Sequence, residues 1–149
     1  MAEIAGQIGS CVRDLDQDLL LTGALLHDIG KAQEYSYVGK IDYTNDGRLL
    51  GHIVMGYQML DEQMSQIVGF PAELRLRLLH IILSHHGQYE FQSPKRPKFA
   101  EALIIHHADM LEADLWKFKD AKEKFPGQDW SPFLPSLERY LYLKDKEGL

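Results

Sequence analysis

The chain has a single cysteine, no long apolar run and no excess of basic residues, and each absence excludes a class of protein. One cysteine, Cys11, cannot form an internal disulfide framework or a cysteine-rich zinc site, so a reducing cytoplasm is the expected location. No stretch approaches the about 18 apolar residues of a membrane span, and the N-terminus lacks the pattern of a signal peptide. We therefore expect a cytoplasmic protein without a membrane segment.

The charge balance bears on possible substrates. A net charge of −6 argues against non-specific, long-range attraction to nucleic acid. A nucleotide or an RNA end remains a possible substrate, because bound divalent cations would reverse the local sign of the charge. One basic cluster, formed by Lys95, Arg96 and Lys98, is either a solvated loop or the phosphate-facing edge of a site. No serine, cysteine or threonine nucleophile with a matched base is evident, which favours direct attack by water.

Apolar residues recur at helical spacing, so the sequence predicts an all-α bundle of five to six helices. The 149 residues most simply form one domain. The expected helices cover about 1–9, 14 or 16 to 30, 49–67, 71–87 and 99–122, with one more near 137–143. Between the second and third, tyrosines and β-branched residues over 35–43 favour extended structure, and Asn45-Asp46-Gly47 is a turn signal. A short hairpin or ordered loop is expected there.

Histidine and aspartate stand out as candidate metal ligands, because they occur in groups on separate expected helices. The candidates are His27, Asp28, His52, His85, His86 and Asp109. Imidazole with carboxylate suits Mn²⁺, Fe²⁺, Ni²⁺, Zn²⁺ or Co²⁺ better than Mg²⁺. An aspartate between two groups of histidines can bridge two ions, and such a pair activates water and stabilises charge on a phosphoryl group. Taken singly, each group has a plainer explanation as an internal hydrogen bond or a solvent-facing helix end.

Three other histidines fit supporting roles better. His106 lies one helical turn before Asp109, which puts both on one face, and it is better explained as a core or supporting residue than as a ligand. His80 and His107 are expected to be structural or on the surface.

The run Leu25–Lys31, with His27-Asp28 at its centre, resembles the signature of the HD-domain metal-dependent phosphohydrolases. The match continues through Gly51-His52, Leu83–Gly87, Ser93–Lys95 and Asp109. Within that superfamily, residues 17–115 are most similar to the HD module of bacterial 3′-to-5′ exoribonucleases of the YhaM type.

The resemblance implies one or two divalent ions that share Asp28. The first ion would have the ligands His27, Asp28 and Asp109, and the second would have Asp28, His52, His85 and His86. It also implies that Lys31 and Lys95 act with Asp28 in catalysis, as contacts to the substrate phosphate.

Two departures from the family pattern limit what the resemblance implies. Family members carry a further histidine upstream of the His-Asp pair, yet residues 1–26 contain none. The exoribonucleases also carry an OB-fold ahead of the HD module, and no β-rich segment is evident here. We expect weak occupancy of the first ion and low activity. We also expect that Met1 is an internal methionine of a longer protein whose upstream helix is missing here.

The expected function is that of a phosphohydrolase or phosphodiesterase, and the resemblance favours a 3′-to-5′ exoribonuclease module acting on an RNA 3′ end. One alternative is a nucleotide or cyclic-dinucleotide phosphohydrolase. Others are a degenerate, non-catalytic nucleotide-binding module and a purely structural helical domain. An abbreviated first helix would leave apolar surface exposed, which predicts self-association.

Overall fold

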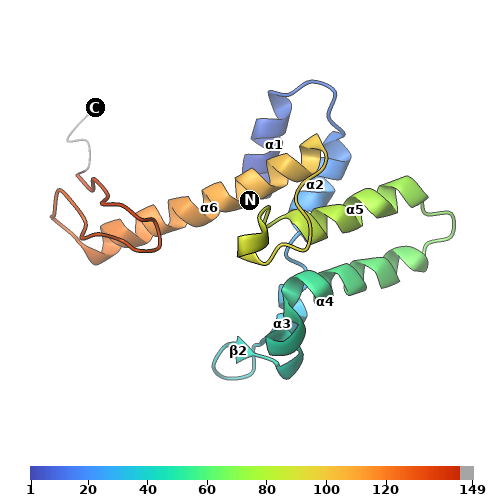
Figure 1. Ribbon diagram of the computed structural model, residues 1–149, viewed down its shortest axis with the longest axis horizontal. Helices are drawn as coiled ribbons and strands as arrows, with labels where there is room; N and C mark the ends of the chain where they lie inside the picture. Colours follow the sequence, from blue (N-terminus) through green and yellow to red (C-terminus); the bar gives the residue numbers. More distant parts are fainter. Residues whose placement is uncertain (145–149) are drawn as a thin grey trace. The chain divides into compact units, whose positions relative to one another are not determined.

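The computed structural model describes residues 1–144, and these are mostly helical (Figure 1). In chain order the elements are α1 (Ala2–Ser10), α2 (Gln17–Leu26), α3 (Lys31–Glu34), β1 (Tyr35–Ser36), β2 (Asp42–Tyr43), α4 (Asn45–Ser65), α5 (Ala72–Ser84), the 3₁₀ helix η1 (Tyr89–Phe91) and α6 (Ala100–Lys124). The predicted all-α bundle with a short hairpin is confirmed. Within residues 1–144, no helix combines the length and the apolar character that crossing a membrane requires.

Packing divides the chain into two compact units, residues 1–109 and the residues from Met110 onward, with the boundary inside α6. Each unit has its own apolar core among the described residues. The prediction of a single domain over the whole chain stays a prediction.

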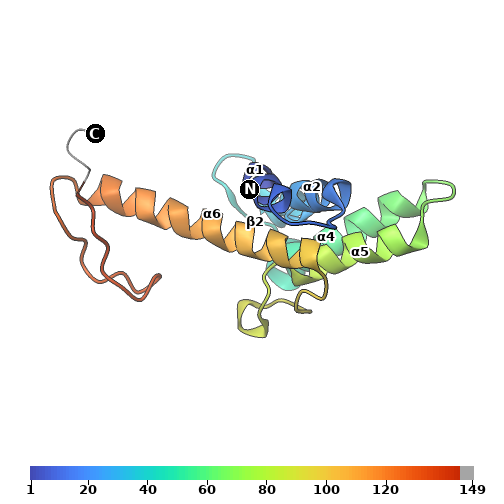
Figure 2. The same ribbon diagram turned by 90° about the horizontal axis from the view of Figure 1, so that it is seen from above.

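The core of the first unit is built by α1, α2, α4, α5 and the first half of α6. Its buried side chains include Ala5, Leu19, Leu20, Ile81, Ile105 and Ala108. Burying a leucine or isoleucine side chain contributes roughly 1.5–3 kcal/mol, so this cluster holds the helices firmly together. Helices α4 and α5 lie side by side in both views (Figures 1 and 2). All six candidate ligands belong to this unit.

The start of α2 shows how a cap and a buried carboxylate fix one helix against another. Asp16 is the cap, and its side chain accepts a hydrogen bond from the Leu19 amide at 2.9 Å. The Asp16 amide in turn donates to Oε1 of the buried Glu101, at 2.8 Å. Of the two aspartates considered from the sequence, Asp16 therefore caps the helix, and Asp14 lies outside it with a φ of 63°.

The segment Asn45-Asp46-Gly47 is the first turn of α4, so the prediction of a turn there was wrong. Thr44 caps the helix, because its Oγ1 accepts from the Gly47 amide at 2.9 Å. Asparagine, aspartate and glycine favour helix starts as well as turns, and the threonine ahead of them decides between the two. The predicted hairpin lies just upstream, where Tyr35 pairs with Tyr43, and Gly39 in its turn has a φ of 80°.

The expected last helix near 137–143 is absent, and the described tail is irregular with two isolated bridges, Trp130 with Tyr142 and Leu134 with Arg139. The leucines at 137, 141 and 143 are buried, in a small cluster with Ala121. Their helix-like spacing therefore reflects burial against α6. Glu138, with a φ of 52°, takes a left-handed conformation that interrupts any helix.

Candidate metal centre

The His-Asp pair follows the last turn of α2, which ends at Leu26 instead of the expected Gly30. Gly30 precedes α3 and lies against α4 so closely that a Cβ there would be 1.9 Å from the His52 carbonyl oxygen and 2.6 Å from the Gly56 amide nitrogen. Only glycine permits this approach. The close contact brings the segment after Asp28 against the helix that carries His52.

His52 lies inside α4, directly after an interruption of the helix. Gly51 has a φ of 74° and a ψ of 157°, so the residues before and after it form two helical segments. The break frees the His52 amide from its helical partner, and that amide donates to Oε1 of Glu34 at 2.9 Å. The sequence predicted a helix start near residue 49, whereas α4 begins at Asn45 and its second segment begins after Gly51.

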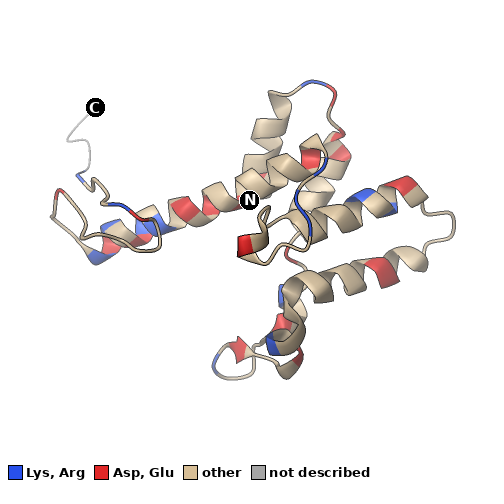
Figure 3. Cartoon of the chain, viewed as in Figure 1, with Lys and Arg blue, Asp and Glu red and all other residues tan. Residues whose placement is uncertain are grey.

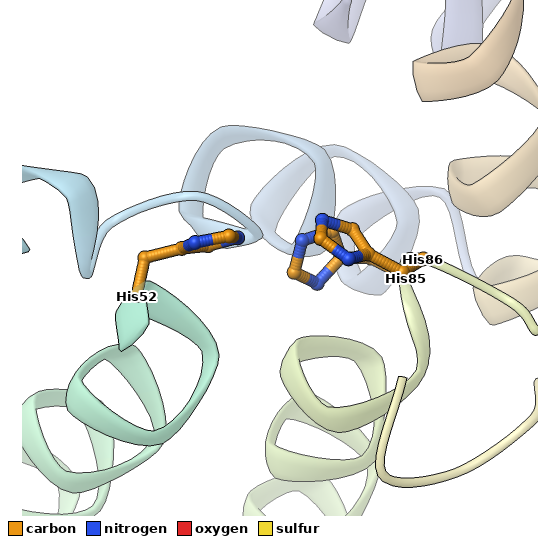
Figure 4. Close-up of side chains that lie close together, drawn as sticks. All are labelled: His52, His85 and His86. Carbon is orange, nitrogen blue, oxygen red and sulfur yellow. The ribbon is translucent and has the colours of Figure 1, made fainter. Parts of the chain in front are cut away.

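His85 and His86 follow α5, and the left-handed Gly87 ends the helix, with a φ of 74°. A Cβ on Gly87 would lie 2.2 Å from the His106 ring, so glycine is required for close packing as well. Adjacent helical side chains point about 100° apart, and this irregular end lets both rings turn to one side. Figure 4 shows them facing His52, with ring centroids 5.6 Å (His85) and 5.2 Å (His86) from it.

Asp28 lies between two groups of candidate ligands. Its Oδ1 is 3.4 Å from His52 Nε2 and 3.6 Å from His85 Nε2. Its Oδ2 is 3.4 Å from His27 Nε2, and that nitrogen is 3.6 Å from Asp109 Oδ1. One group is His27, Asp28 and Asp109, and the other is His52, His85 and His86. Within each group the potential ligand atoms lie within 4.8 Å of one another. The six residues singled out from the sequence therefore converge.

The imidazoles are oriented by hydrogen bonds on the side away from the centre. The Nδ1 atoms of His27, His85 and His86 lie 2.9, 2.7 and 2.8 Å from the carbonyl oxygens of Ala24, Ile82 and Phe91. A carbonyl oxygen only accepts, so each Nδ1 is the donor and, in the neutral ring, each Nε2 keeps its lone pair for the centre. This is the arrangement that holds and orients metal-ligating histidines.

Three buried polar atoms at the centre, Asp28 Oδ1, His52 Nε2 and His85 Nε2, have no hydrogen-bond partner within residues 1–144. Leaving a buried acceptor unpaired costs about 1–3 kcal/mol, so three such atoms facing one another need an explanation. A divalent cation would satisfy all three at once, and imidazole with carboxylate is a suitable donor set. The residues present therefore fit a metal ion.

The electrostatics lead to the same conclusion. Burial disfavours a protonated His27, but Asp109 and Asp28 outweigh it and raise the pKa of His27 to about 9. Burial also opposes ionisation of Asp28, yet His27, His85 and Lys31 hold its pKa far below the usual range. Asp28 and Asp109 thus stay negative, and a metal ion bound between them would take the place of the proton on His27.

Glu34 contacts the candidate ligand His52, and the sequence did not point to it. It is 5% exposed, and its Oε1 accepts from both the His52 amide and His52 Nδ1, the latter at 3.2 Å. It lies outside the motif, and no periodicity marks it. His106 acts similarly on the other side, because its Nδ1 donates to the His85 carbonyl oxygen at 2.8 Å, in keeping with the supporting role expected of it.

Lys31 and Lys95 differ in their relation to the centre. Lys31 Nζ lies 2.6 Å from Asp28 Oδ2, and Lys31 lines a cleft of about 750 Å³ together with His52 and His86. Lys95 is not among the residues that line this cleft. Lys95 lies on the basic segment before α6, which is blue in Figure 3. There, burial of His80 and the nearby charges of Lys98 and Lys95 lower the pKa of His80. Arg48 lines the cleft instead, and the sequence did not point to it.

Neutralising Glu34 tests its orienting role. In Glu34→Gln we expect Mn²⁺ affinity to fall about tenfold or more, because partners that orient ligating histidines typically contribute 10–100-fold. Titration calorimetry with Mn²⁺ measures the change. Glu73→Gln, at an exposed position in the first turn of α5, is the matched control and should bind as the unmodified chain does. Equal affinity of the two variants would contradict the assigned role.

Comparison with known proteins agrees with this geometry. The family model described as HD domain matches residues 1–114. The chain is 37% identical over 144 residues to the 3′-5′ exoribonuclease YhaM of Bacillus velezensis, and 36% identical to that of Bacillus subtilis. Each alignment covers 97% of this chain and 46% of the relative. The chain thus spans about half the length of these relatives.

No solved structure matches the chain. The family model covers most of the chain and all six converging residues, and the resemblance drawn from the sequence is confirmed. The chain therefore belongs to the HD-domain family.

Proposed function

We propose that this chain is a metal-dependent phosphohydrolase or phosphodiesterase module whose substrate is the 3′ end of a single-stranded RNA. The observation that carries the proposal is the position of Asp28, with one oxygen facing His52 and His85 and the other facing His27. The choice of RNA draws support from relatives named 3′-5′ exoribonucleases.

The side chains around Asp28 would act as metal ligands, and backbone groups would orient them. When bound, divalent ions would supply an activated water molecule and neutralise charge on the phosphoryl oxygens. His27, Asp28 and Asp109 would hold one ion, and Asp28 with His52, His85 and His86 would hold the other. The backbone carbonyls bonded to the Nδ1 atoms keep the rings oriented.

Lys31 is the cation best placed to contact the substrate. Its ammonium group is beside Asp28, and 44% of its side chain is exposed, so it can reach a phosphate oxygen in the cleft. Charge placed in advance near the phosphate stabilises the transition state without reorganisation. A phosphate contact by Lys95, a cytoplasmic location and self-association stay predictions.

We expect Mn²⁺, Fe²⁺, Co²⁺, Ni²⁺ or Zn²⁺ in preference to Mg²⁺, with unequal occupancy of the two positions. The group of His27, Asp28 and Asp109 offers three protein ligands and has no further histidine among residues 1–26. Metal analysis after purification and dialysis should therefore give about one tightly bound ion per chain. Two tightly bound ions per chain would contradict this expectation.

The function is tested by incubating the purified chain with Mn²⁺ and a 5′-labelled single-stranded RNA. Stepwise shortening from the 3′ end supports the proposal, whereas release of phosphate from a nucleotide alone supports the small-nucleotide alternative. Binding without turnover would indicate a non-catalytic module. In parallel, Mn²⁺ at about 100 times its Kd should stabilise the fold by about 2.7 kcal/mol, seen as a rise in Tm. No rise in Tm would favour a purely structural domain.

A further inference from the structure

The cleft beside the metal centre has an aromatic wall that the proposed chemistry does not use. The wall is formed by the hairpin, where Tyr35 and Tyr43 pair across the two strands with ring centroids 4.7 Å apart. Both tyrosines line the cleft, and so do the candidate ligands His52 and His86. Phosphate chemistry alone needs no aromatic surface, so the wall calls for a separate explanation.

Arg48 indicates which kind of group this wall accepts. Its guanidinium lies over the Tyr43 ring, 5.4 Å from the ring centroid, and Asp42 Oδ1 holds it at 2.8 Å. A guanidinium plane and a nucleobase are both flat groups that stack on aromatic rings. The ring face over which Arg48 lies is therefore one that a base can use when the Arg48 side chain, 58% exposed and hydrogen-bonded to Asp42, turns aside.

The rest of the wall is apolar and exposed. Leu49 and Leu50 line the cleft and are 82% and 53% exposed, and Tyr43 is 45% exposed. Large apolar side chains left open beside a polar centre mark a surface that a ligand covers. The volume of about 750 Å³ lies within the range of about 300–1,000 Å³ that is typical of small-ligand sites.

The hydroxyl groups of the wall suit a phosphate neighbour. The Tyr35 hydroxyl donates to that of Tyr43 at 3.2 Å, and this bond, with burial and Glu34, raises the pKa of Tyr35 above its usual value. Tyr35 is neutral near pH 7, as a tyrosine with the ordinary pKa of about 10 would be. The two cations that line the cleft, Lys31 and Arg48, then face an incoming phosphate without repulsion from the rings.

We propose that Tyr43, backed by Tyr35, is a stacking subsite for the nucleobase attached to the phosphate that is bound at the metal centre. The proposal rests on the proposed function and narrows its substrate to phosphates that carry a base. Stacking uses the flat face that all bases share. The subsite therefore favours a nucleotide with any base over a phosphate without a base. The shared chemistry is that of a nucleotide, either at an RNA end or free.

The test compares ligands with and without a terminal base. Binding of a fluorescent single-stranded RNA is measured by anisotropy with Mn²⁺ present, using a phosphorothioate terminal linkage to slow cleavage. A second oligonucleotide is identical except that its 3′-terminal residue lacks the base. The unmodified chain should bind the first about tenfold more tightly. Tyr43→Leu should remove that difference, and Tyr43→Phe should retain it.

The matched control is Tyr37→Leu, which changes an exposed tyrosine of the same hairpin that does not line the cleft. This variant should keep the tenfold preference. Competition by adenosine monophosphate distinguishes the two sources of the base: full competition indicates a free nucleotide, and weak competition indicates an RNA end. Equal affinity of the unmodified chain for both oligonucleotides, or equal weakening of both by Tyr43→Leu, would overturn the proposal.

The failure of this subsite can be told apart from failure of the proposed function. If the unmodified chain hydrolyses no phosphate ester with Mn²⁺, the enzymatic proposal fails, yet the preference for a terminal base is still read from binding. If hydrolysis proceeds equally on both oligonucleotides and binding shows no preference, the subsite proposal fails while the enzymatic one stands.

Discussion

Replacing Asp28 by asparagine is expected to slow hydrolysis severely and to remove tight Mn²⁺ binding. Asp28 has one oxygen facing each group of candidate ligands, at 3.4 Å from His27 and from His52. The amide keeps the size of the side chain but lacks the charge and the second oxygen. Loss of several kcal/mol of charge stabilisation corresponds to a decrease on the order of 10²–10³-fold in kcat. Rates on single-stranded RNA and calorimetry with Mn²⁺ measure both effects.

Asp18→Asn is the control, because Asp18 is exposed in the first turn of the helix that leads to Asp28. It should lose only a few tenths of a kcal/mol of helix stabilisation and no activity. Circular dichroism would establish that both variants are folded. An Asp28→Asn variant with undiminished kcat and Mn²⁺ affinity would show that Asp28 does not hold the ions.

Gly30→Ala is expected to destabilise the fold by about 3 kcal/mol or more and to reduce activity with it. The added Cβ would be 1.9 Å from the His52 carbonyl oxygen, which belongs to the backbone and cannot rotate away. Overpacking of this kind typically costs 1–3 kcal/mol and sometimes more, and a cost of about 3 kcal/mol is roughly 6–12 °C in Tm for a chain of this size. Since α3 and α4 must separate to relieve it, His52 would move away from Asp28.

Gly39→Ala serves as the comparison, because Gly39 lies in the hairpin turn and its added Cβ would have no atom of the described residues within 4 Å. The only cost there is a left-handed backbone, about 1 kcal/mol, which leaves the metal centre intact. Thermal unfolding followed by circular dichroism ranks the two variants. A Gly30→Ala chain as stable as Gly39→Ala would mean that the close approach of α3 and α4 is not required.

The candidate ligands could be predicted because their signals are local. His27-Asp28 follows an apolar helix, and His85-His86 follows another and precedes a glycine. Each pair therefore places polar side chains at the end of a helix that the sequence predicts to be buried. Together with His52 and Asp109 these groups implied a shared centre, and the structure brings them together.

The residues that support the centre could not be predicted, because their roles depend on contacts between distant segments. Glu34 bonds to a residue 18 positions away, across an interface that exists only because Gly30 and Gly47 allow close approach. Arg48 enters the cleft because Thr44 starts a helix where the sequence also allowed a turn. Neither outcome follows from periodicity or from a motif.

The rings of His27 and His85 are hydrogen-bonded to the carbonyls of Ala24 and Ile82, three residues earlier, and these bonds restrict where the domain can vary in length. Each ligand is tied to the final turn of its own helix, so one inserted or deleted residue in α2 or α5 would rotate its ring by about 100° and shift it by about 1.5 Å along the axis. Insertions and deletions should therefore be confined to connections such as the hairpin turn and the link between α4 and α5, while the registers of these two helices stay constant.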